Sequence, residues 1–102
     1  MALINLTPHE IVLVGGPTIP PSGAVARVAS VATWAGEFEG VALSRVAFGD
    51  VQNLPTPQAG VIYIVSALVR AAVPSRADVA SPGELVRSAD GQPVGCKGLI
   101  IN

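Results

Sequence analysis

An uninterrupted apolar run in the middle of the chain constrains the fold most. Residues Val61 to Val65 read Val-Ile-Tyr-Ile-Val, and a loop rich in proline and glycine precedes them. A strand without polar residues on either side must be buried on both faces, so we expect this strand at the centre of a sheet. The chain has 102 residues, which leaves no room for a second core and predicts a single domain over residues 1–102.

Shorter apolar segments between glycines and prolines predict the remaining strands. Pro8 bends the chain near its start, so residues 3–6 and 10–14 form two short strands or one interrupted strand. Hairpins are expected to turn at Gly40 and at Asp90-Gly91. The segment from Ala24 to about Val31 reads as a strand, although its valine spacing also fits a helix. The other predicted strands cover residues 41–48, 61–65, 85–88 and 94–101.

One short helix is predicted directly after the central strand. Ser66 can cap it, and Val65, Leu68, Val69, Ala72 and Val73 fall on one helical face. Pro74 ends the helix, and residues 75–83 are expected to form a loop. The predicted fold class is α+β and mostly antiparallel β. It is a small barrel or curled sheet of roughly six to eight short strands, with the helix at about 66–73 plugging one end.

Composition excludes several classes of protein. Hydrophobic residues make up 50% of the chain and charged residues 13%, so exposed apolar patches and self-association are expected. The net charge of −1 disfavours generic nucleic-acid binding. Membrane binding is not expected, because no apolar stretch reaches the roughly 18–20 residues that cross a bilayer. Cys96 is the single cysteine and the start of the chain lacks a basic leader, so a cytoplasmic protein is expected.

The reactive side chains do not assemble a catalytic motif. His9 is the single histidine and follows Pro8 at a strand break, where it is either a binding residue or a turn residue. Ser66, His9 and Asp78 could be drawn as a triad, but Ser66 lacks the Gly-x-Ser-x-Gly elbow and capping explains it. One histidine and one cysteine do not make a zinc site. We therefore expect no enzyme activity, no metal and no cofactor.

The stretch from Tyr63 to Asp78 is the most suggestive one. Arg76 can form a salt bridge with Asp78, or it can offer its guanidinium to an anionic ligand beside an acceptor for a hydroxyl. Five of the six basic residues are arginines, which suit bidentate capture of phosphate or carboxylate. Arg45 lies on a hairpin face. Tyr63 and Trp34 could stack a base, although core packing is the default for both.

Several short elements resemble a group of small, mostly uncharacterised proteins of phages, prophages and bacteria. The resemblance covers nearly the whole chain. The matching elements, whose order is specific, include Asn5-Leu6-Thr7-Pro8-His9, Pro20-Pro21-Ser22-Gly23, Tyr63-Ile64-Val65-Ser66 and Arg76 with Asp78-Val79. The resemblance implies a phage-like setting, and the host cytoplasm if a phage encodes the protein.

Small phage proteins without catalytic groups often act by binding, and this analogy sets the functional expectation. The expectation is a homo-oligomeric anti-defence sponge that sequesters a nucleotide-derived immune signal, a small nucleotide-like anion. One alternative is an inhibitor that covers a host protein surface, and another is a small hydrolase or lyase that uses His9. The candidate ligand-binding residues are Asn5, His9, Arg45, Tyr63, Ser66, Arg76 and Asp78.

Overall fold

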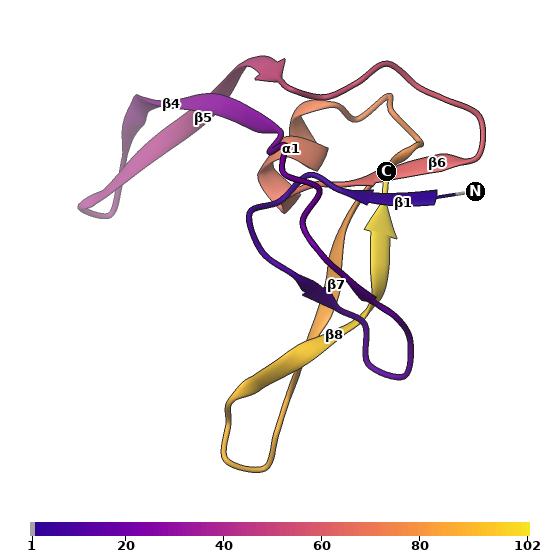
Figure 1. The fold of residues 1–102 in the computed structure, drawn as a ribbon. Coiled ribbons are helices and arrows are strands. Elements are labelled where there is room, and N and C mark those ends of the chain that lie inside the picture. The colour runs from indigo at the N-terminus through magenta and orange to yellow at the C-terminus, as the bar shows by residue number, and fades with distance from the viewer. Residues whose placement is uncertain (1) are drawn as a thin grey trace.

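The centre of the molecule is an open sheet of four strands. The computed structural model describes residues 2–102, and Figure 1 traces them from the N-terminus to the C-terminus. The sheet order is β1-β6-β7-β8. β6 pairs in parallel with both neighbours, whereas β7 and β8 pair antiparallel. The four strands are β1 (Ala2–Asn5), β6 (Val61–Ile64), β7 (Val79–Arg87) and β8 (Pro93–Ile101).

The α+β class is confirmed, and the closed barrel is not found. Within residues 2–102, β1 and β8 stay at opposite edges of the sheet, and the remaining strands form two separate two-stranded sheets. Because the two edge strands β1 and β8 do not pair with each other there, the sheet stays open. Antiparallel pairing is the more common arrangement within residues 2–102, as predicted. Within the main sheet β6 pairs in parallel with both of its neighbours, because long connections return the chain in the same direction.

The central strand is buried on both faces, as its apolar run predicts. Tyr63 and Val65 pack on one side with Leu6 and Val79, while Ile64 packs on the other side with a second cluster. This division follows from the alternation of side chains along a strand. The second cluster contains Ile11, Ile19 and Cys96.

The short connection from β6 places the helix against the first cluster. α1 (Ala67–Ala72) begins after Ser66, whose Oγ accepts a hydrogen bond of 3.2 Å from the backbone N–H of Val69. Val69 is the buried residue of the helix. The predicted helix and its cap are therefore confirmed.

A small hairpin covers the second cluster. β2 (Ile11–Val12) and β3 (Thr18–Ile19) pair with each other and lie in a different sheet from β1. The chain start thus forms two short strands, one of the two predicted alternatives. Pro8 lies in the segment between them, where the backbone changes direction.

β7 extends into a segment predicted as a loop. The prediction for residues 75–83 is wrong from Val79 onward, because Pro82 and Gly83 lie inside the strand. β6 stops pairing with β7 at Ala80, so the missing N–H of Pro82 leaves no ladder bond to β6 unmade. At Gly83 the carbonyl of Lys97 comes so close that a Cβ would collide with it. Close strand pairing therefore explains a glycine that looks like a turn signal.

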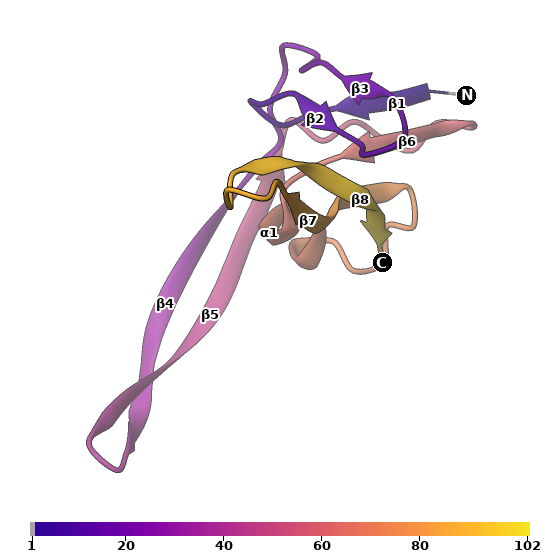
Figure 2. The same cartoon turned by 90° about the horizontal axis from the view of Figure 1, so that it is seen from below.

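The most extended part of the molecule is a long hairpin. β4 (Arg27–Phe38) and β5 (Val41–Gln52) pair antiparallel and turn at Glu39 and Gly40, which have φ angles of 51° and 80°. The predicted hairpin is confirmed, but it is longer than the sequence indicated. It projects from the sheet as a twisted ribbon, which we call the arm, residues 27–52 (Figures 1 and 2).

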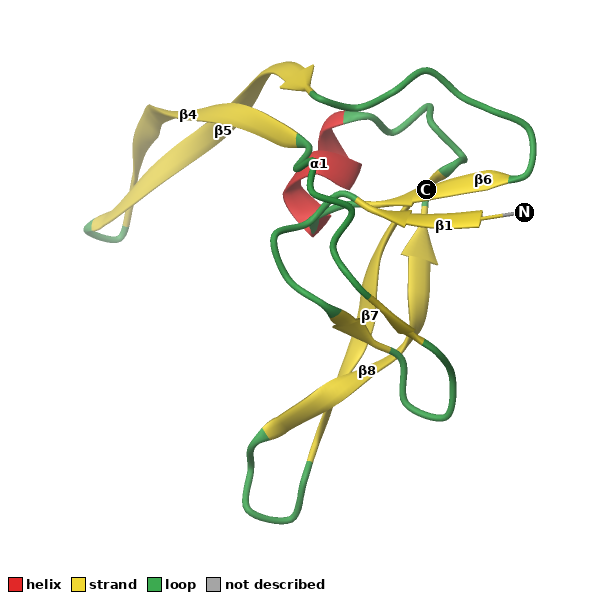
Figure 3. Ribbon diagram, viewed as in Figure 1, coloured by secondary structure: helices red, strands yellow, loops and turns green. Residues whose placement is uncertain are grey.

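The arm gives the molecule an open shape. The radius of gyration is 16.1 Å, compared with about 13 Å for a compact chain of this length. Figure 3 shows that the β7–β8 hairpin also extends beyond the helix and the short strands, in a direction different from that of the arm. The molecule consequently has a small core, from which two ribbons project. We call the part of the chain outside the arm the body.

Candidate functional site

The first candidate, Asn5, organises the turn that follows β1. Its side chain is buried, and its Nδ2 donates to the carbonyl oxygens of His9 and Ile19 at 2.8 and 3.1 Å. Its Oδ1 accepts from the N–H of Thr7 at 2.9 Å and lies 2.6 Å from the Thr7 hydroxyl. These partners use the hydrogen-bonding capacity of the amide, so Asn5 holds a turn together.

The same turn also involves the Pro20-Pro21-Ser22-Gly23 element. The hydroxyl of Ser22 donates to the Asn5 carbonyl oxygen at 2.7 Å, and its backbone N–H donates to the same oxygen at 3.0 Å. The Asn-Leu-Thr-Pro-His and Pro-Pro-Ser-Gly elements are thus joined in space. Both elements therefore consist partly of residues that build the fold.

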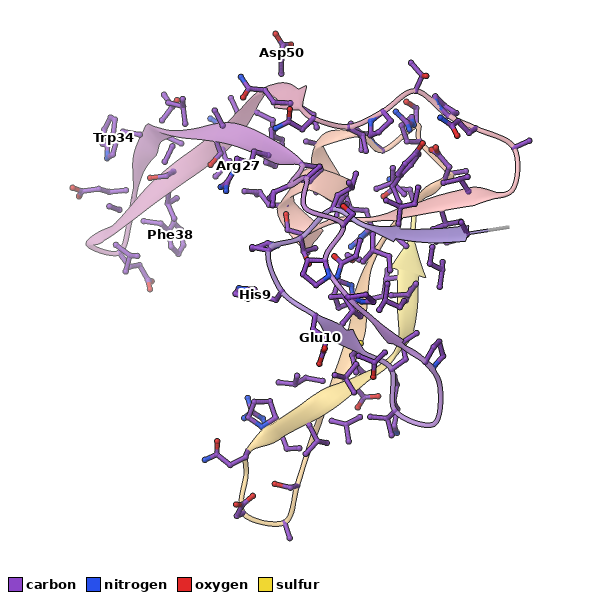
Figure 4. All side chains as sticks on the ribbon, in the orientation of Figure 1. His9, Glu10, Arg27, Trp34, Phe38 and Asp50 are labelled. Carbon is purple, nitrogen blue, oxygen red and sulfur yellow. The ribbon has the colours of Figure 1, made fainter. Side chains whose placement is uncertain are left out.

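His9 stands at the outer side of this turn. Its backbone N–H and carbonyl take part in the turn, whereas its imidazole is exposed (Figure 4). No hydrogen bond joins the imidazole to Ser66 or to a carboxylate within residues 2–102. The triad drawn from the sequence is consequently not assembled in the described chain.

Tyr63 and Ser66 also have structural partners. Tyr63 is 1% exposed, and its hydroxyl donates to the Thr56 carbonyl oxygen at 3.3 Å. Its ring is packed in the first cluster and offers no face to a base. Ser66 caps the helix through its oxygen, while its own hydroxyl proton has no acceptor among the described residues.

Arg76 and Asp78 form a bidentate ion pair. Nε and Nη2 of Arg76 lie 2.7 and 2.8 Å from the two carboxylate oxygens, and Nη2 also donates to the Pro55 carbonyl oxygen at 3.0 Å. The hydrogen bonds from Arg76 hold the pKa of Asp78 below its usual value, and the carboxylate raises the pKa of Arg76. The pair fastens the loop before β6 to the loop before β7, which is the structural alternative considered above.

Arg45 lies on the arm and is separate from the other candidates. It pairs across the ribbon with Thr33 on an exposed stretch. The structure therefore does not bring the seven candidates into one site. Tyr63, Arg76 and Asp78 lie near each other, as shown by the 2.9 Å hydrogen bond from the Tyr63 N–H to the Asp78 carbonyl oxygen.

A hollow at the base of the arm brings together three polar residues from distant segments. It has a volume of about 220 Å³, and Thr7, Arg27 and Ser66 line it beside the apolar residues Pro8 and Leu68. Arg27 is exposed and has no hydrogen-bonding side-chain partner within residues 2–102. Figure 4 shows its side chain where the arm joins the body. Sequence reasoning missed Arg27, because only the fold brings the start of β4 beside the turn after β1.

A larger hollow lies along the β1–β6 edge of the sheet. It has a volume of about 550 Å³ and is mostly apolar, with Leu3, Val61 and Ile62 among its lining residues. Asp78 and Gln58 are its polar residues. Since Asp78 is already paired with Arg76, this hollow favours apolar contact over anion binding.

The described chain offers neither a metal site nor a membrane helix. Within residues 2–102, no three His, Cys, Asp or Glu side chains gather closely enough to hold a metal ion. In the same residues no helix is long and apolar enough to cross a bilayer. No protein-family model matches the chain, and no match was found among curated proteins or solved structures.

Proposed function

We propose that this protein is a non-enzymatic binding protein that captures a small nucleotide-like anion in the hollow at the base of the arm. The observation that carries this proposal is Arg27, whose guanidinium has no side-chain partner in the described chain and which lines the same hollow as Ser66. A guanidinium donates two parallel hydrogen bonds to a phosphate, and the hydroxyl supplies a further donor.

The size of the hollow supports a part of a nucleotide as its occupant. Its 220 Å³ lies below the roughly 300–1,000 Å³ of sites that enclose a drug-sized ligand. A phosphate with its sugar matches that volume, and the base would lie outside against apolar residues such as Pro8 and Leu68. The ligand would be half-enclosed by one copy of the chain.

Binding without turnover is part of the proposal, and the side chains that were considered for catalysis have other arrangements within residues 2–102. Ser66 and His9 do not form a nucleophile–base pair there, and Asp78 is occupied by Arg76. In the phage-like setting that the resemblance implies, such a protein would act as an anti-defence sponge. It would lower the free concentration of a nucleotide-derived immune signal in the host cytoplasm.

A thermal-shift screen tests the proposal. Cyclic dinucleotides and ADP-ribose derivatives are added to the full chain, and a ligand at 100 times its dissociation constant should stabilise the folded state by about 2.7 kcal/mol. Arg27→Ala should abolish the shift. The matched control is Arg87→Ala, because Arg87 bonds only to the Gly91 carbonyl oxygen in the β7–β8 hairpin. No shift with any member of the panel contradicts the proposal.

A second candidate function is inhibition of a host protein. The apolar side chains exposed on the arm favour it, because exposed apolar surface of this extent marks a protein contact. The same surface is explained by a second copy of this chain, and the experiment in the next subsection separates the two.

A further inference from the structure

The arm carries large apolar side chains on both of its faces. The cross-strand register puts Trp34, Val46 and Phe48 on one face, since Trp34 pairs with Ser44 and Ser30 pairs with Phe48. The opposite face holds Val31, Phe38, Val41 and Leu43. Trp34 is 69% exposed and Phe38 is 67% exposed, and both lie away from the body (Figure 4). A ribbon with one solvated face would alternate apolar and polar residues, and this one does not.

The arm also lacks the support that a hairpin requires. A two-stranded ribbon alone in water is marginally stable at best. Within the described chain, β4 and β5 pair only with each other, so each strand leaves one edge of backbone groups unpaired. The apolar faces and unpaired edges of the arm therefore require packing contacts that residues 2–102 of a single copy do not provide.

The exposed area sets the scale of these contacts. The surface of the chain is 6689 Å², whereas a compact monomer of this mass exposes about 5,400 Å². The difference of about 1,300 Å² is shared by the arm and the β7–β8 hairpin, and a standard protein interface removes about 800 Å² from each partner. At about 200 Å² per aromatic side chain, the exposed parts of Trp34, Phe38 and Phe48 alone come to roughly 350 Å².

We propose that the arm assembles this protein into a homo-oligomer in which other copies of the chain pack on both faces of each arm. This proposal does not depend on the identity of the ligand. One flat partner would cover one face and leave the other in water, so each arm lies between two surfaces. These surfaces come from two other copies, or from one copy whose arm intertwines with it.

A second copy explains the chemistry of the arm better than a host protein does. Permanent homo-oligomer interfaces are apolar like a divided core, whereas transient partners meet through more polar surfaces. The charges of the arm nearly balance, with Arg27 and Arg45 against three carboxylates, and the chain has a net charge of −1, so no strong field of one sign steers a foreign partner. The body of the same chain offers apolar surface in return, in the hollow along β1 and β6.

Trp34 is the only tryptophan, which makes its fluorescence a direct probe of the arm. Native mass spectrometry of the purified full chain should give one oligomer. The emission of Trp34 should be blue-shifted in that oligomer and should move to the red on dilution to monomers. A monomer at micromolar concentration, or an oligomer with water-exposed Trp34 emission, overturns the proposal. Trp34 emission that is water-exposed in the pure protein and blue-shifts only when a host protein is added also overturns it, in favour of host inhibition.

A paired exchange tests the second face. The double variant Trp34→Phe/Phe38→Trp moves the single tryptophan to the opposite face and keeps both positions aromatic. Its emission should be blue-shifted in the oligomer as well. If only the parent protein shows the shift, one face of the arm is solvated and the two-sided packing is wrong.

Single substitutions measure the energetic share of each face. Trp34→Ser and Phe38→Ser should each weaken self-association by about 30-fold or more, which is the effect of losing a central aromatic anchor. The matched control is Leu85→Ser, because Leu85 is also an exposed apolar residue but lies on β7. Circular dichroism checks that each variant folds. Unchanged association of both arm variants contradicts the proposal. If a variant does not fold, the Trp34 fluorescence of the wild-type protein tests the proposal instead.

Discussion

The central strand and the arm are built from the same kinds of residue and meet opposite surroundings. β6 has a strand at each edge and a buried cluster on each face. More than half of the residues of β4 and β5 are also apolar, mainly valine, alanine and aromatic residues, yet most of their side chains are exposed. Apolar sequence indicates that a segment must be covered, but it does not say whether the cover comes from the same chain. The comparison separates residues that hold the fold from residues that a single copy of the chain leaves exposed.

The largest expected effect lies in the core. Tyr63→Ala should lower the free energy of unfolding by about 3–5 kcal/mol, because it removes a fully buried ring from the first cluster. Urea denaturation followed by circular dichroism measures the change. Tyr63→Phe is the control and should cost about 1 kcal/mol, since it removes only the hydroxyl bond to Thr56. A small effect of Tyr63→Ala would show that the body is not the stable part of the molecule.

The turn around Asn5 should come next. Asn5→Ala removes both the donor to Ile19 and the acceptor for Thr7, and it leaves buried backbone groups unpaired. We expect a loss of about 2–4 kcal/mol in the free energy of unfolding. The same urea titration checks this value. A variant of wild-type stability that loses ligand binding would instead identify Asn5 as a pocket residue.

The Arg76–Asp78 pair should have a smaller effect, and one that depends on pH. The pKa of Asp78 is lowered in the folded protein by the hydrogen bonds from Arg76, so protonation opposes folding. The stabilisation is present above the unfolded pKa of about 3.9, and it is lost as pH falls through the lower folded pKa. Asp78→Asn should cost about 1–2 kcal/mol near pH 7 and should flatten this acid decline. A wild-type pH profile in the variant would contradict the assignment.

The smallest effect on unfolding should come from the arm. At concentrations where the chain is monomeric, Trp34→Ala should change the free energy of unfolding by less than about 0.5 kcal/mol, because the side chain is 69% exposed. At higher concentrations the wild-type midpoint should rise with protein concentration, as it does when assembly stabilises the folded state. A concentration-independent loss of several kcal/mol would mean that the arm folds back on its own body.

Local sequence signals predicted the helix, the central strand and the turns of both long hairpins. Ser66 and Pro74 lie within two residues of the observed helix ends, and Gly40 marks the arm turn by its positive φ. The open, partly parallel sheet was not predictable in the same way. It depends on β1 meeting β6 across a long segment, and no local pattern encodes such a pairing.

The candidate site was predictable only in part. The sequence drew attention to Arg76 and Asp78 as a pair, and it left the salt bridge and the ligand role open. It did not indicate Arg27, since a single arginine at the start of a strand looks like a surface residue. Its place in a hollow depends on Thr7 and Ser66, which lie far from it in the chain.

The position of the arm within the chain has a consequence for the speed of folding. β1 and β6 can pair only after the segment between them closes into a loop, and the arm makes up nearly half of that segment. A hairpin forms within microseconds from local contacts. Once formed, it joins Arg27 to Gln52 and roughly halves the loop that remains, which lowers the entropic cost of closure by about 0.6 kcal/mol. We therefore expect the arm to speed the folding of a core to which it contributes few side chains.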